Sequence, residues 1–93
     1  MQAKGELYTS EKPKILIVDD EFSVRKSLQE SLSKDFFVTV SSCGKEAEAL
    51  WQKDVFDIIL LDIILPDSNG INLLKKIKRD FPETNVIMIT AAR

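Results

Sequence analysis

Apolar residues in this chain fall into two patterns, short unbroken runs and stripes at helical spacing. The unbroken runs are rich in β-branched and aliphatic residues and predict four strands, at residues 14–18, 36–40, 57–62 and 85–90. Such runs are typical of strands that are buried on both faces, as in a parallel sheet. The run at 57–62 is the most apolar, which predicts a central place in that sheet.

Three amphipathic stretches lie between these runs. Each predicts a helix whose apolar residues share one face: Val24, Leu28 and Leu32 in a helix at 22–33, Ala47, Leu50 and Trp51 in the second, and Leu73, Leu74, Ile77 and Phe81 in the third. Pro82 ends the third helix, because proline cannot continue one. The resulting order, βαβαβαβ, predicts an α/β fold with parallel strands and right-handed crossovers.

The length of 93 residues limits the chain to one domain, which we expect at residues 14–93. Residues 1–13 are polar and lack the apolar core of a signal peptide, so we expect a flexible leader there. The longest apolar stretch, at 58–65, is interrupted by Asp62 and is too short to cross a bilayer. These features favour a cytoplasmic protein that does not contact a membrane.

Composition excludes several classes of function. The 13 basic and 15 acidic residues give a formal net charge of −2, so nothing indicates a nucleic-acid-binding surface in these residues. Cys43 is the only cysteine, and the chain has no histidine. An internal disulfide, a zinc site and a Ser-His or Cys-His nucleophile pair are therefore not expected.

Three aspartates stand at the ends of two predicted strands. Asp19 and Asp20 close the first run, and Asp62 closes the third. Parallel strands end at the same edge of a sheet, where open α/β folds bind ligands, so we expect the three carboxylates to converge. Like charges repel, and a cluster of oxygens suits Mg²⁺. Asp62 stands alone after the most apolar run and is the better candidate nucleophile for a phosphoryl group, whereas Asp19 and Asp20 resemble a metal cradle.

Three motifs, two of which contain these aspartates, resemble the receiver domain of two-component response regulators. They are Val18-Asp19-Asp20-Glu21, Leu61-Asp62-Ile63-Ile64-Leu65-Pro66 with Gly70, and Ile87-Met88-Ile89-Thr90-Ala91. The resemblance covers residues 14–93. It implies a flavodoxin-like, three-layer (βα)₅ fold with strand order 2-1-3-4-5, in which the four strands present here would pair in the order 2-1-3-4.

The resemblance also implies a role for each site residue. Asp62 would accept a phosphoryl group from a sensor histidine kinase. Asp20, Asp62 and the backbone carbonyl of Ile64 would bind Mg²⁺ directly, with Asp19 acting largely through water. Thr90 matches the hydroxyl residue that binds the phosphoryl group and moves inward on activation, and Ala91 matches the small residue beside it.

The sequence departs from the family pattern at its end. Receiver domains have a lysine at the end of a fifth strand, and no lysine here lies at that place. We therefore expect a receiver truncated after its fourth strand and weakly active or inactive by itself. We expect it to self-associate through the exposed strand at 86–90 and an uncovered face of the first helix.

The output domain, expected to bind DNA, would lie outside this chain. The residues at 65–67 and 71–74 are similar to those of nitrogen-regulator-type transcriptional activators.

Other functions remain open at this point. A Mg²⁺-dependent phosphatase or phosphotransferase of the haloacid dehalogenase type would have a carboxylate two residues after its nucleophile, where this chain has Ile64. A nucleotide or flavin carrier is disfavoured because the loop at 19–23 is acidic and lacks glycine. A dimerisation module that kept the fold would not need the acidic trio of Asp19, Asp20 and Asp62.

Asp67 could approach the metal, but we predict a turn residue there.

Overall fold

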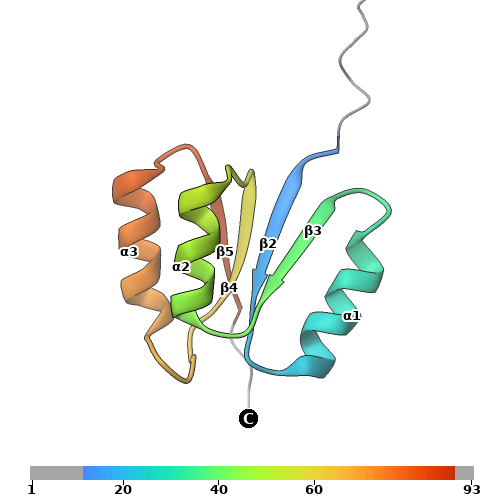
Figure 1. Cartoon of the computed structure of the whole chain (residues 1–93), viewed down its shortest axis with the longest axis horizontal. Coiled ribbons are helices and arrows are strands. Elements are labelled where there is room, and N and C mark those ends of the chain that lie inside the picture. Colours follow the sequence, from blue (N-terminus) through green and yellow to red (C-terminus); the bar gives the residue numbers. More distant parts are fainter. Residues whose placement is uncertain (1–11, 90–93) are drawn as a thin grey trace, which may run out of the picture.

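The computed structural model describes residues 12–89, which form four strands and three helices (Figure 1). The strands are β2 (Lys14–Val18), β3 (Phe37–Ser41), β4 (Ile58–Asp62) and β5 (Asn85–Ile89). The helices are α1 (Phe22–Leu32), α2 (Gly44–Lys53) and α3 (Gly70–Asp80). They follow one another in the predicted order βαβαβαβ.

The four strands pair in parallel, in the order β3-β2-β4-β5. Counted along the chain, this is the predicted order 2-1-3-4. The most apolar strand, β4, lies between β2 and β5, so its predicted interior position is confirmed. β5 forms one edge of the sheet within the described residues.

The second strand begins one residue later than predicted. The amide of Phe36 donates a hydrogen bond to the carbonyl of Leu32 at 2.9 Å, so Phe36 belongs to the turn after α1. Phe37 is the first paired residue and lies opposite Lys14. The hydrophobic pattern alone could not show this, because both positions are phenylalanine.

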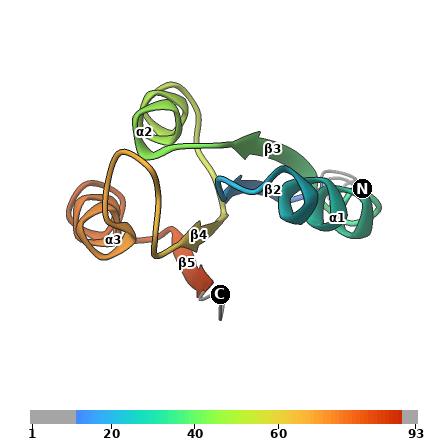
Figure 2. The same cartoon turned by 90° about the horizontal axis from the view of Figure 1, so that it is seen from below.

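The helices cover both faces of the sheet, with α2 and α3 on one side and α1 on the other (Figure 2). Alternation along β2 divides its buried residues between the two faces. Leu16 and Val18 join the core cluster with α2 and α3, whereas Ile15 and Ile17 are buried outside that cluster. The result is the expected three-layer arrangement.

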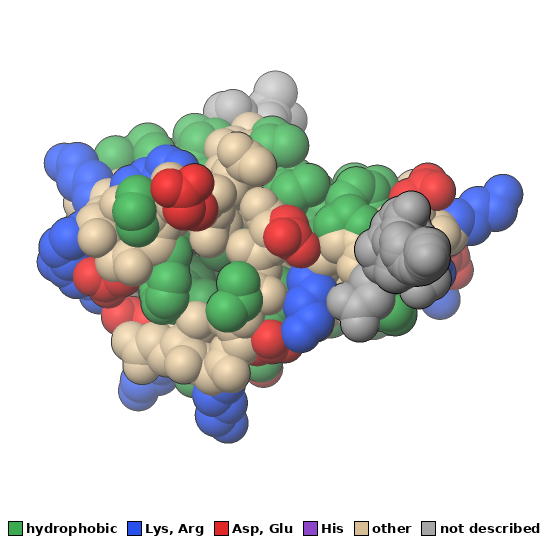
Figure 3. Space-filling model, turned by 90° about the horizontal axis from the view of Figure 1, so that it is seen from above, with side chains coloured by type: hydrophobic (Ala, Val, Ile, Leu, Met, Phe, Trp, Pro, Cys, Tyr) green, Lys and Arg blue, Asp and Glu red, His purple; other side chains and the backbone are tan. Residues whose placement is uncertain are grey.

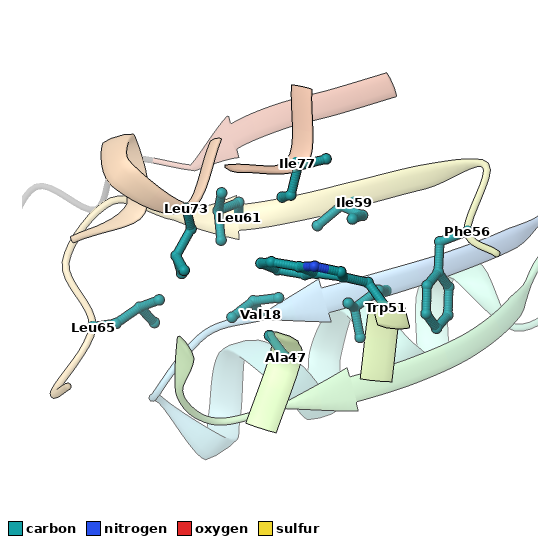
Figure 4. Packing of buried hydrophobic residues seen from close by; sticks show 10 residues of the cluster. Val18, Ala47, Trp51, Phe56, Ile59, Leu61, Leu65, Leu73 and Ile77 are labelled. Atoms are coloured by element: carbon teal, nitrogen blue, oxygen red, sulfur yellow. The ribbon is translucent and has the colours of Figure 1, made fainter. Parts of the chain in front are cut away.

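The main core lies between the sheet and helices α2 and α3. Figure 4 shows Trp51 of α2 among the strand residues Val18, Ile59 and Leu61. Trp51 is only 3% exposed, which agrees with its predicted role in the core. Burial of an aliphatic side chain in such a core contributes about 1.5–3 kcal/mol, so this layer holds α2 and α3 firmly against the strands.

Helix α1 is held less firmly. None of its residues is fully buried, and the predicted stripe of Val24, Leu28 and Leu32 is half-buried. Beside α1 an open, mostly apolar groove runs over the sheet and is lined by Ser23, Val24, Ser27, Leu28, Leu60, Ile87 and Ile89. This face of the described structure is therefore only partly covered.

Figure 3 shows the end of the sheet where the strands begin, at which acidic and basic side chains are mixed. Lys14 and Asp54, for example, form an ion pair at 2.7 Å. The opposite edge, where the strands end, contains the aspartate motifs. Within residues 12–89, no helix has the length and hydropathy to cross a membrane.

Candidate functional site

The parallel register of β2 and β4 brings the three aspartates together. Val18 pairs with Leu61, so Asp19 and Asp62 both follow this pair at the carboxyl edge of the sheet. The carboxylates of Asp19, Asp20 and Asp62 each offer an oxygen atom, and these oxygens lie within 4.8 Å of one another. The predicted convergence of the three carboxylates is thus observed.

Burial and hydrogen bonds fix two of the three side chains. Asp19 and Asp62 are each 1% exposed, whereas Asp20 is exposed. The Asp19 carboxylate accepts a hydrogen bond from the amide of Glu21 at 2.9 Å, at the entrance to α1. The Asp62 carboxylate accepts one from the amide of Ile64 at 3.2 Å. Each of these carboxylates is therefore oriented by the loop that follows its own strand.

An arginine that the sequence analysis did not single out lies beside this cluster. The Arg25 guanidinium donates to the backbone carbonyl of Asp19 at 2.8 Å and lies over the ring of Phe22, 5.8 Å from its centroid. Helical spacing places Arg25 one turn after the start of α1. The contact could not be predicted, since it depends on how α1 leaves the sheet.

The loop after β4 is folded tightly against the end of that strand. The amide of Gly70 donates to the carbonyl of Ile63 at 2.7 Å, and Ile64 forms an isolated antiparallel bridge with Asn69. The Asn69 side chain accepts from the amide of Ile71 at 2.7 Å and caps α3. These contacts hold the loop around Ile64, which follows Asp62 by two residues.

Asp67, in the same loop, has a role that the sequence analysis missed. Its two carboxylate oxygens accept hydrogen bonds from the amides of Gly44 at 2.8 Å and Lys45 at 2.9 Å, which begin α2. Both bonds favour the ionised form and hold the pKa of Asp67 below its usual value, with the Lys45 amide contributing most. A turn residue was predicted because no local pattern shows a cap that acts across 23 positions.

Two predicted site residues, Thr90 and Ala91, lie outside the described residues. The described ladder ends with Ile89 paired to Asp62. The roles expected for Thr90 and Ala91 stay predictions.

The donor set at the carboxyl edge fits Mg²⁺. It consists of the carboxylate oxygens of Asp19, Asp20 and Asp62. Ile64, whose carbonyl is expected to be a ligand, follows Asp62 by two residues. Mg²⁺ is a hard cation that prefers oxygen ligands, keeps several waters and takes one or two carboxylates. One exposed carboxylate, Asp20, beside two buried ones gives such an ion protein ligands and access to water.

Comparison with known proteins identifies the family. The sequence model of the response regulator receiver domain family matches residues 15–93 of this chain. The chain belongs to the response regulator receiver domain family. Receiver domains are signalling switches and bind Mg²⁺ at an acidic pocket.

Similar proteins include transcriptional regulators. The chain is 41% identical over 81 residues to the probable transcriptional regulator ycf27 of Guillardia theta, covering 86% of this chain and 32% of that protein. It is 42% identical over 79 residues to the response regulator protein PilR of Pseudomonas aeruginosa, covering 84% of this chain and 18% of that protein. This receiver domain therefore spans a third or less of these two relatives.

Solved receiver domains share the fold. The non-phosphorylated HemR receiver domain from Leptospira biflexa superposes with a TM-score of 0.81 at 34% identity, covering 87% of this chain and 66% of that one. The BeF3-activated DrrB receiver domain gives a TM-score of 0.78 at 32% identity, covering 88% and 68%. The flavodoxin-like receiver fold is thus confirmed. The expected likeness to nitrogen-regulator-type activators stays a prediction.

Gly70 provides a test of how tightly the site is packed. A Cβ atom at Gly70 would lie 2.7 Å from the Cα of Ile63 and closer still to the carbonyl oxygen of Asp62. Because these are backbone atoms that cannot rotate away, we expect Gly70→Ala to cost about 1–3 kcal/mol in urea unfolding. A Cβ at Gly44 would meet mainly the Ser68 hydroxyl, which can rotate, so Gly44→Ala should cost less. Equal stability of Gly70→Ala and the wild type would contradict this packing.

Proposed function

We propose that this receiver domain is a phospho-accepting switch in which Asp62 takes a phosphoryl group from a sensor histidine kinase. The main support is the placement of Asp62: it is buried, oriented by the Ile64 amide, and clustered with Asp19 and Asp20. In a switch, phosphorylation of the acceptor has to change the contacts of the loops around it. Asp62 contacts the loop after β4 through the Ile64 amide, so its phosphorylation would alter that loop.

In the proposed reaction, a carboxylate oxygen of Asp62 attacks the phosphorus of a phosphohistidine. A P–O bond forms, the P–N bond breaks, and the imidazole leaves with a proton from solvent. The product is an acyl phosphate. This chain contributes position rather than covalent chemistry, because phosphoryl transfer depends mainly on alignment and charge neutralisation. The hydrogen bond from the Ile64 amide to Asp62 fixes the carboxylate for attack.

Asp20, Asp62 and the backbone carbonyl of Ile64 would hold Mg²⁺, and Asp19 would act through a water molecule. The bound ion would neutralise charge on the phosphoryl oxygens. Asp19 is held in position by two hydrogen bonds. Its carboxylate accepts from the amide of Glu21, and its backbone carbonyl accepts from Arg25. Thr90 would bind the transferred phosphoryl group, with Ala91 leaving space beside it.

The proposed partners follow from the family and its relatives. The kinase is a sensor histidine kinase, and the output is a DNA-binding domain outside these residues, in keeping with the transcriptional regulators among the relatives. We place the protein in the cytoplasm. An enzyme of the haloacid dehalogenase type is disfavoured, because Ile64 occupies the position of its second carboxylate.

Phosphorylation of Asp62 can be tested by mass spectrometry. Because we expect these 93 residues to be weakly active or inactive by themselves, the longer parent protein that would carry this receiver domain is incubated with Mg²⁺ and acetyl phosphate, and its intact mass is measured. We expect the wild type to gain one phosphoryl group and Asp62→Asn to gain none, since the amide is not a nucleophile for this reaction. Asp57→Asn, at the opposite edge of the sheet, is the matched control and should be labelled like the wild type. A wild type that stays unlabelled, or an Asp62→Asn protein that is labelled, would refute the proposal.

We further propose that these 93 residues associate with a second copy through β5 and the groove beside α1. β5 lies at the edge of the described sheet, and its Ile87 side chain is 54% exposed. Ile87 also lines the apolar groove with Leu28 and Leu60. An apolar edge strand of this kind offers backbone groups and side chains to a like strand.

Self-association can be tested by light scattering at high micromolar concentration. We expect the wild-type chain to form dimers or larger species and Ile87→Lys to shift it toward the monomer, because a charge at the edge opposes strand pairing. Val55→Lys is the control, since Val55 is 72% exposed and lies away from the groove. A well-folded wild-type monomer at that concentration would exclude the proposal.

A further inference from the structure

We propose that Asp67 is a positioning residue for the metal site, acting through the loop that bears Ile64. This inference rests on the proposed function, because it concerns the same Mg²⁺ site. Asp67 lies outside the acidic trio and joins the loop after β4 to the start of α2.

The first step is the bidentate contact that Asp67 makes. Its Oδ1 atom accepts from the Gly44 amide at 2.8 Å and its Oδ2 atom from the Lys45 amide at 2.9 Å. Both oxygens are therefore engaged with backbone donors. Asp67 is also absent from the acidic group that offers oxygens within 4.8 Å, which contains Asp19, Asp20 and Asp62 among the described residues. A direct role of Asp67 as a metal ligand does not fit this arrangement.

The second step is the need of α2 for this carboxylate. The helix begins after Cys43, whose side chain makes no capping hydrogen bond. The first amides of a helix have no partner within the helix, and a negative charge there is favoured by the helix dipole. Glu46 places one negative charge in the first turn of α2. Asp67 adds a second charge and the acceptors for the amides of Gly44 and Lys45, from a different loop. The helix start and the loop are also in close contact, since a Cβ atom at Gly44 would collide with Ser68.

The third step connects Asp67 to the site. Three residues before Asp67, the amide of Ile64 orients the Asp62 carboxylate, and the carbonyl of Ile64 is the proposed metal ligand. On the other side of Asp67, Asn69 pairs with Ile64 and caps α3. The loop is thus anchored at Gly70 and Asn69 toward α3 and at Asp67 toward α2. Release of the Asp67 anchor frees the middle of the loop while leaving the acidic trio itself unchanged.

The test compares Asp67→Ala with Asp57→Ala. Asp57 accepts a hydrogen bond from the amide of Lys14 at 2.8 Å, at the opposite edge of the sheet. Both substitutions remove one carboxylate that accepts from backbone amides, two at Asp67 and one at Asp57, so they match in charge and in the type of contact that is lost. Mg²⁺ is titrated into each protein by calorimetry, and amide hydrogen exchange is measured without metal. Thermal unfolding provides the stability of each variant.

We expect Asp67→Ala to raise the dissociation constant for Mg²⁺ about tenfold, the range typical of residues that support metal ligands. Exchange of the Ile64 amide should become faster together with that of Gly44 and Lys45. Asp57→Ala should lose stability without either change. Asp67→Asn, which keeps one acceptor oxygen, should give an intermediate Mg²⁺ affinity.

The outcomes distinguish this inference from the proposed function. If Asp67→Ala binds Mg²⁺ like the wild type, or if only the Gly44 and Lys45 amides exchange faster, Asp67 is a helix cap alone and the inference is wrong. If the wild type itself does not bind Mg²⁺, the proposed metal site is wrong. Hydrogen exchange then still tests the positioning role, which is rejected if the Ile64 amide exchanges as slowly in Asp67→Ala as in the wild type.

Discussion

The register between β2 and β4 is the constraint on which the rest of the site depends. Val18 pairs with Leu61 in the interior of a parallel sheet, so the residues after them leave at the same edge. Side chains in a strand alternate between faces, and a slip by one residue would move the buried set to the wrong face. The burial of Leu16, Val18, Ile59 and Leu61 under α2 and α3 therefore also sets Asp19 beside Asp62.

This arrangement has an electrostatic cost. The oxygens of the three carboxylates lie within 4.8 Å of one another, and like charges at such distances repel. The net stability of a small domain is only about 5–15 kcal/mol, so such repulsion has to be offset by the rest of the fold. The apolar core under α2 and α3 is what holds the carboxylates in place against this repulsion. A divalent cation at the same end of the sheet would attract all three carboxylates and so offset their mutual repulsion. Metal binding and the stability of the fold are therefore linked.

The sequence predicted the elements well because they rest on local patterns. Four apolar runs and three amphipathic stretches were enough for the order of the elements along the chain and the convergence of Asp19, Asp20 and Asp62. It did not predict the contacts of Asp67 with Gly44 and Lys45, or of Arg25 with Asp19, since these join residues from different loops or depend on the direction of a helix. The start of β3 was misplaced for a similar reason, because Phe36 bonds back to α1.

The central claim, that three aspartates form a Mg²⁺ site, is tested most directly by thermal unfolding with and without Mg²⁺. At about ten times its dissociation constant, a ligand of the folded state stabilises by about 1.4 kcal/mol, which corresponds to a rise in Tm of about 5–10 °C for a domain of this size. We predict that rise for the wild type and its loss in Asp20→Asn, measured at constant ionic strength. The same rise in both proteins, or none in the wild type, would contradict the claim.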